Sequence, residues 1–265
     1  MFQKKYRSIA KITMQNTLVY RFNYFISLIA SLIFILSMFY LWKSIYAGRT
    51  ELGGFTWDQM KAYLFITFLT NSLVSWYSET GISRKILDGS VAMDLLKPLN
   101  FQKARLAETL GSSIVEGLIG AIFISIFVFL FAGVLVPDHI VTTVLFAISL
   151  VVSLVLKFSI VYIFSLLCFW TTSAVGIAWS RAAITNLFSG ALIPLTFFPD
   201  WLKALASILP FQGIVYIPAS IYLGKIQGVE AVQMIFLQLF WVIVLWMAGK
   251  LMWNWAVRQV TIHGG

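Results

Sequence analysis

This sequence contains few of the residues that enzymes use for chemistry. Cys168 is its one cysteine, which rules out an internal disulfide, and it has only two histidines. There is no G-x-x-x-x-G-K-[ST] phosphate loop, no H-E-x-x-H motif and no C-x-x-C pair. Its serines lack a nearby histidine or aspartate to orient a nucleophile. We therefore expect a chain that is not an enzyme by itself and that binds neither a metal ion nor a cofactor.

Charge is scarce as well. Only 11% of the residues are charged, 60% are hydrophobic, and the mean hydropathy is +0.90. This composition is typical of an integral membrane protein. A membrane span needs roughly 20 apolar residues, so the length allows about six spans. We predict one all-α membrane domain, residues 1–265. In a membrane protein, a net charge of +9 is explained by Lys and Arg residues that flank the spans. No nucleic-acid partner is therefore expected.

Apolar runs flanked by aromatic residues locate the spans. We predict them at residues 22–46, 59–79, 105–133, 140–170, 174–197 and 231–257. A short turn with Pro137 precedes the fourth span. Most of the flanking Lys and Arg residues lie at the ends that carry both termini and the connection between the second and third spans. The positive-inside rule assigns these ends to the cytoplasm.

The first residues of the chain, 1–21, have the pattern of an amphipathic helix. One face carries apolar and aromatic side chains and the opposite face carries basic ones: Phe2, Tyr6, Ile9, Ile12 and Tyr20 against Lys4, Arg7 and Lys11. Two interpretations fit this pattern. The segment is either an elbow helix lying on the inner leaflet or a plain charged anchor that orients the first span.

The connection between the second and third spans, residues 82–104, has strong local signals. Asp88 and Gly89 form a turn signal, and Ser90 is suited to cap a short helix that Pro98 ends. Asn100 can then cap the third span.

Two short helices in this connection would expose apolar side chains to the cytoplasm unless lipid headgroups or a partner covers them. We favour a partner. The residues predicted to make this contact are Arg84, Lys85, Ile86, Leu87, Asp88, Gly89, Val91, Met93, Leu95, Leu96, Lys97 and Pro98.

Prolines gather late in the chain, in residues 194–225. Four of the six occur there: Pro194, Pro199, Pro210 and Pro218. A straight helix cannot run through them. We expect either two short re-entrant helices at the outer side or an ordinary external loop.

Two predicted spans carry polar stripes at helical spacing. The second has Thr67, Thr70, Asn71, Ser75 and Ser78, and the fifth has Thr185, Asn186, Ser189 and Gly190, leading to Pro194. Such stripes either hold helices together or line a translocation path.

Two ionisable residues fall deep inside predicted spans, Glu116 and Lys157. Exposing such a charge to lipid is costly, so its position usually has a function. These two residues form either a structural pair or a substrate or coupling site.

Several short motifs together resemble a known family. They are R-K-I-L-D-G-S-V-A-M-D-L-L-K-P at 84–98, S-G-A-L-I-P-L at 189–195, F-F-P-D-W-L at 197–202, P-F at 210–211 and the terminal H-G-G. In order and spacing the chain resembles the ABC-2 type permeases of ATP-binding cassette exporters, in the branch associated with multidrug or viologen export. Ala191 is a departure, because a glutamate is expected there.

The resemblance implies six spans, an elbow helix, a coupling helix at 82–104 and outer re-entrant helices at 194–225. It also implies a bacterial cytoplasmic membrane and a complex of two permeases, identical or homologous, with two ATPase subunits that hold ATP and Mg²⁺. We expect export of a hydrophobic or amphipathic substrate, cationic drugs included. The alternatives are a secondary transporter driven by an ion gradient and a membrane scaffold that transports nothing.

Overall fold

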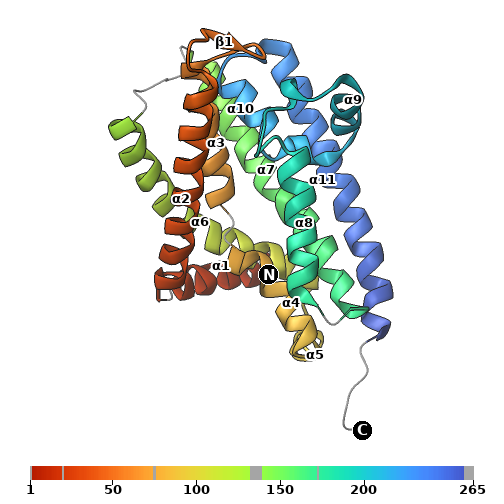
Figure 1. Ribbon diagram of the computed structural model, residues 1–265. Coiled ribbons are helices and arrows are strands. Elements are labelled where there is room, and N and C mark those ends of the chain that lie inside the picture. Colours follow the sequence, from red (N-terminus) through yellow and green to blue (C-terminus); the bar gives the residue numbers. More distant parts are fainter. Residues whose placement is uncertain (1, 20, 74–75, 132–138, 172, 260–265) are drawn as a thin grey trace.

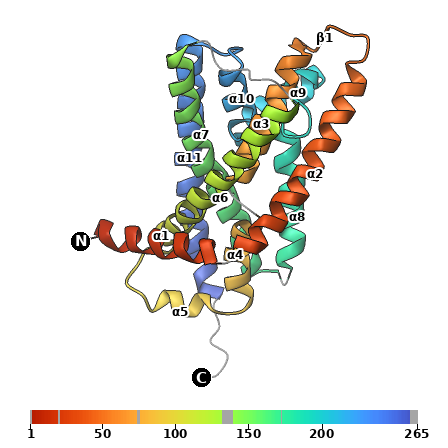
Figure 2. The ribbon, with the colours of Figure 1, turned by 90° about the vertical axis from the view of Figure 1, so that its left-hand side faces the viewer.

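The computed structural model describes residues 2–19, 21–73, 76–131, 139–171 and 173–259. Upright helices form a bundle, and helix α1 (Phe2–Val19) lies across one end of it (Figures 1 and 2). The short helix α5 (Val91–Leu95) projects beyond α1 at the same end, which we call the α5 end. A small β-hairpin marks the opposite end, which we call the hairpin end.

Four helices in the described part of the chain are long and apolar enough to cross a membrane. They are α2 (Arg21–Ile45), α6 (Phe101–Phe131), α7 (Ile140–Leu166) and α11 (Gly228–Ala256). Their runs of Leu, Ile, Val and Phe contain no proline, so backbone hydrogen bonding continues unbroken along each. Short 3-10 turns follow α7 at 167–169 and α11 at 257–259. The predicted spans match these four helices, except that α6 and α11 begin earlier than expected. The predicted turn at Pro137 lies outside the described residues.

The two remaining predicted spans are not single helices. Residues 59–79 fall in α3 (Trp57–Ser72) and α4 (Trp76–Leu87), and α8 (Ala174–Phe188) ends well before residue 197. Helix α3 ends at Ser72, whose hydroxyl donates to the Leu69 carbonyl at 2.9 Å. After α8, Gly190 adopts a positive φ of 83°. Helices α3 and α8, of 16 and 15 residues, are each shorter than a complete crossing.

The hairpin, β1 (Glu51–Leu52) with β2 (Phe55–Thr56), covers the start of α3. The Tyr46 hydroxyl donates to the Phe55 carbonyl at 2.9 Å. The Lys225 ammonium group donates to the Gly54 carbonyl and lies 4.0 Å from the centre of the Phe55 ring. The hairpin is therefore tied both to the end of α2 and to the chain that leads into α11.

The proline-rich segment forms short helices, and whether they are re-entrant stays a prediction. They are α9 (Asp200–Ile208) and α10 (Tyr216–Tyr222), with 3-10 turns at 195–197 and 210–213. Helix α10 is buried against α7 and α3, whereas α9 exposes Trp201 and Ile208. Pro194 is buried at the end of α8. The side of the membrane that these helices face stays a prediction.

Helix α1 packs along α6. A side chain at Gly111 of α6 would place its Cβ 2.3 Å from the Ala10 carbonyl oxygen, so the two backbones touch. The backbone N–H of Asn100 donates to the Tyr6 hydroxyl at 3.2 Å. Of the predicted apolar face, Tyr6 and Ile9 are half-buried, whereas Ile12 is 56% exposed. Tyr20 and the Phe2 side chain lie outside the described part. The lipid-facing role of α1 stays a prediction.

We predict that Gly111→Ala destabilises the protein by about 1–3 kcal/mol, because the new methyl group must push α1 away from α6. Gly81 in α4 is the matched control. A Cβ there meets nothing within 4 Å, and its φ is not positive, so Gly81→Ala should be neutral or slightly stabilising. Thermal unfolding in detergent measures both variants. Equal melting temperatures for the two would contradict the close contact.

Candidate functional site

The connection between α4 and α6 is an ordered turn that leads into a short helix. Gly89 has a φ of 74°, and the Asp88 carboxylate accepts the Ser90 backbone N–H at 2.9 Å. Helix α5 then runs to Leu95 and ends before Pro98. Ser90 occupies the N-cap position as expected, but its side chain makes no capping hydrogen bond. The predicted cap of α6 forms, because the Asn100 side chain accepts the Lys103 N–H at 3.0 Å.

The apolar residues of this connection divide into an inner and an outer set. Ile86 and Val91 are buried in a cluster that includes Phe101 of α6 and Tyr162 of α7. The outer set is exposed at the projecting tip: Leu87, Met93, Leu95 and Leu96, the last with 78% of its surface accessible. We call these four the outer apolar set. Arg84, Asp88, Gly89, Lys97 and Pro98 are exposed beside them, and Lys85 is half-buried.

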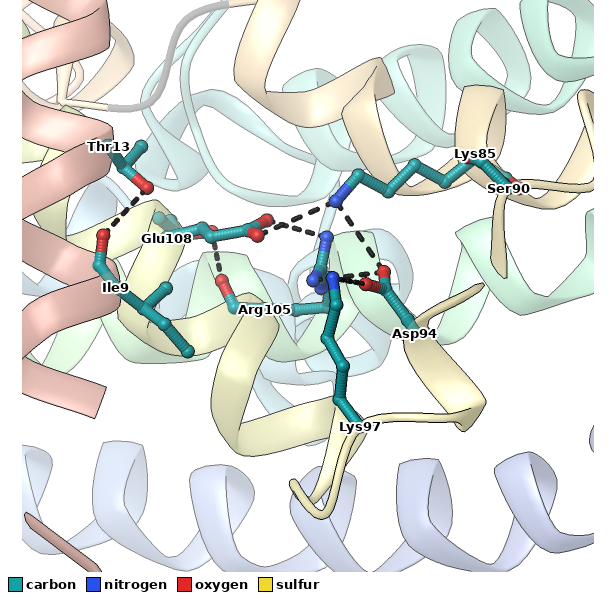
Figure 3. A network of polar contacts seen from close by, with 9 residues as sticks. Ile9, Thr13, Lys85, Ser90, Asp94, Lys97, Arg105 and Glu108 are labelled. Carbon is teal, nitrogen blue, oxygen red and sulfur yellow. Dashed lines mark hydrogen bonds and ion pairs between the residues drawn. The ribbon is translucent and has the colours of Figure 1, made fainter. Parts of the chain in front are cut away.

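Ion pairs fix α5 to the helices on either side. The Asp94 carboxylate of α5 lies 2.7 Å from Lys97 Nζ, 3.1 Å from Arg105 Nη2 of α6 and 3.6 Å from Lys85 Nζ of α4. Arg105 also lies 2.7 Å from Glu108, which in turn lies 3.5 Å from Lys85. Figure 3 shows these side chains converging from the three helices.

Asp94 stays ionised because of this arrangement. Partial burial alone would raise its pKa, but the Lys97 hydrogen bond and the charges of Arg105 and Lys85 outweigh it, and the pKa lies below the ordinary value. Arg105 is only 5% exposed, so its charge is poorly screened by water. Asp94 therefore holds the outer apolar set on a rigid base.

A second ion cluster lies inside the bundle and joins three helices. Glu79 of α4 contacts Lys157 of α7 at 2.9 Å and Arg181 of α8 at 2.5 Å, one cation at each carboxylate oxygen. All three side chains are buried. Arg181 lies within the predicted fifth span, residues 174–197, and the structure pairs it with Glu79.

The ion pair described for Lys157 is thus with Glu79. Glu116, the predicted partner, is buried on α6. Its pairing with Lys157 stays a prediction. Glu79 is the last residue of the predicted second span, a few residues before Arg84 and Lys85. In the sequence it therefore resembles a residue that flanks the membrane, and its buried partners could not be recognised.

The predicted polar stripes have different surroundings. Thr67 and Thr70 of α3 are buried, and their hydroxyls donate to the Tyr63 and Ile66 carbonyls of the same helix, at 3.0 and 2.9 Å. These hydroxyl protons therefore do not bridge helices. Asn71 is half-buried, and Ser75 and the Ser78 side chain lie outside the described part. On α8, Thr185 is buried and Asn186 is half-buried.

The end of α8 is tied to α3 and α10 through carbonyl groups. The Tyr63 hydroxyl donates to the Gly190 carbonyl at 2.7 Å, and the Tyr216 N–H donates to the Ser189 carbonyl at 3.0 Å. Ser189 and Ala191 are buried. The Ala191 side chain, at the position where a glutamate was expected, is therefore surrounded by protein.

The fold and these clusters together define a multi-pass helical membrane protein with a projecting, ion-paired helix at one end. A family model described as ABC-2 family transporter protein matches residues 11–264 of this chain. The chain belongs to this family, which supplies the membrane domain of ABC transporters. No curated protein matches the chain.

We predict that Glu79→Gln costs about 3–5 kcal/mol, because it removes the carboxylate that two buried cations contact. Adding Arg181→Met should recover part of the loss, since one of the two buried positive charges is then gone. Unfolding in a mild detergent with increasing SDS measures both variants. A loss below about 1 kcal/mol for the single variant, the range of an exposed pair, would show that Glu79 is not buried in this way.

Proposed function

We propose that this chain is the permease subunit of an ATP-driven exporter, and that α5 with the turn before it receives a separate cytoplasmic ATPase subunit. The observation that carries the proposal is the outer apolar set. Exposed apolar residues on a loop would ordinarily collapse inward or bind lipid, but the ion pairs of Asp94 keep these on a rigid projection. Such a projection suits a protein partner that covers it.

The connectivity indicates how a push on α5 would travel. Helix α4 begins at Trp76, carries Glu79 near its start and ends at the turn before α5. Movement of α5 is therefore passed through α4 to Glu79, and from there to Lys157 on α7 and Arg181 on α8. ATP and Mg²⁺ would be held by the ATPase subunits. This is a rigid-body switch between two arrangements of the helices.

In this proposal the permease works as a pair, identical or homologous, with two ATPase subunits. The α5 end faces the cytoplasm and α1 rests on the inner leaflet. Helices α3 with α4, and α8 with the chain that follows it, complete six crossings of a bacterial cytoplasmic membrane. The hairpin end and α9 then face outward.

We place the translocation path between the polar stripes of α3 and α8. Its wall comprises Thr67, Thr70, Asn71, Ser75, Thr185, Asn186, Ser189 and Pro194. The buried Thr185 hydroxyl has no hydrogen-bond partner among the described residues, which supports this placement because a buried polar atom usually has one. The cargo is a hydrophobic or amphipathic molecule, cationic drugs included.

We predict that Leu95→Asp together with Leu96→Asp abolishes co-purification of the ATPase subunit and stops ATP-dependent export from vesicles. Two charged groups would replace the apolar side chains at the centre of the contact. Leu205→Asp in α9 is the matched control, because Leu205 and Leu95 are 42% and 43% exposed. An unchanged complex in the double variant would overturn the docking role of α5.

We also predict that Asn71→Trp and Asn186→Trp block export while the ATPase subunit still co-purifies. Both asparagines are half-buried, so a larger side chain can be accommodated at the proposed wall. Transport assays and substrate-stimulated ATP hydrolysis are the measurements. The same substitution at Asn16, which is exposed on α1 and lies in neither proposed site, tests whether any added indole has this effect. Normal transport in both wall variants would place the path elsewhere.

A further inference from the structure

Beside α5 the structure has a small cavity of about 200 Å³ at the α5 end. It lies between α5, the start of α6 and the last turns of α11. The residues that matter for the argument are Asp94, Leu95, Phe101, Lys250, Trp253 and Asn254. None of these α11 residues was singled out from the sequence as part of a contact surface.

Stacking and close packing hold the cavity walls in place. The Phe101 and Trp253 rings stack with centroids 4.0 Å apart and planes within 7°. The Gln102 side chain donates to the Trp246 carbonyl at 3.2 Å. At Gly249 a Cβ would come within 3.0 Å of the Gln102 side chain, so α6 and α11 approach closely. The cavity is therefore preformed and has one flat aromatic wall.

The negative charge beside the cavity is already paired, whereas the positive one is not in a described ion pair. Asp94 already contacts three cations, Lys85, Lys97 and Arg105. Lys250, by contrast, is exposed and takes part in none of the ion pairs described for this chain. The cavity therefore offers a positive charge, that of Lys250, for an anionic group to pair with. Apolar walls lie beside it.

We infer that this cavity receives an acidic side chain of the ATPase subunit, which pairs with Lys250 while an apolar neighbour packs against the ring pair of Phe101 and Trp253. The inference rests on the proposed function and extends its contact surface from α5 to α11. Leu95 lines the cavity and also belongs to the outer apolar set, so the two surfaces are continuous.

The position of the cavity favours a protein over a lipid headgroup. It is lined by α5, which projects beyond α1 in both views of the bundle (Figures 1 and 2). Because we place α1 on the inner leaflet, the end of the molecule that α5 forms extends beyond the headgroups, where a protein side chain can reach Lys250. Anionic phospholipid is accordingly an outcome that the test must distinguish.

A contact between the ATPase subunit and α11 would let the ATPase move a second pair of helices in addition to α4. Helix α11 packs along α7, and Gln238 of α11 contacts Ser149 of α7 at 3.0 Å and the Gly213 carbonyl at 2.7 Å. Closure of the ATPase subunits would then act on α11 and α7 directly, in parallel with the push through α4 and Glu79.

The test is site-specific photocrosslinking in cells with the full chain and its ATPase. A benzophenone amino acid replaces Leu96, Lys250 or, as a control at the hairpin end, Lys203 of α9. We expect the probes at 96 and 250 to label the same nucleotide-binding subunit, the peptide labelled from 250 to contain an acidic residue, and the probe at 203 to label no such subunit.

Charge reversal provides the second measurement. Lys250→Glu should lower the amount of ATPase subunit recovered with the permease about tenfold, and reversing the labelled acid to Lys should restore it. Lys203→Glu should have no effect. If the probe at 96 labels the ATPase while the probe at 250 labels only phospholipid or nothing, this inference is overturned and the docking role of α5 stands. If neither probe labels it, both fail.

Discussion

An apolar bundle can hold an ionised side chain only against an opposite charge, and this constraint organises the protein. Removing a charge from water costs several kcal/mol unless a partner and hydrogen bonds compensate. Among the described residues, Asp94 at the α5 end and Glu79 within the bundle both illustrate this requirement. In both places one carboxylate contacts cations from different helices, so the ion pairs determine how those helices are positioned.

These two clusters lie at the two ends of a single helix. Helix α4 carries Glu79 in its first turn and leads at its other end into the turn before α5. In the proposed mechanism, a force applied at α5 would therefore reach Glu79 along α4. Other contacts stabilise the hairpin end: the hydrogen bond from Tyr63 to the Gly190 carbonyl and the contact of Lys225 with the Phe55 ring. The two ends of the bundle are therefore held by separate sets of interactions.

The sequence predicts well what depends on neighbours along the chain. The turn at Asp88 and Gly89, the cap at Asn100 and the long apolar helices follow from local propensity and hydropathy. Partners distant in sequence were not predictable in this way. Arg181 looks like a membrane-flanking cation, and only the packing of α8 against α4 reveals that it is buried against Glu79. The early end of α8 was also missed, because it depends on Gly190 and its long-range contact with Tyr63.

The shared carboxylate of Glu79 has a consequence for how this protein can change over generations. Its partners lie on two helices, so loss of the acid removes the carboxylate that both cations contact, whereas loss of one cation leaves the acid paired with the other. Lineages that lose the acid are expected to replace both cations with it. The acid should therefore be lost only together with its cations, although more than seventy residues separate it from the nearer one.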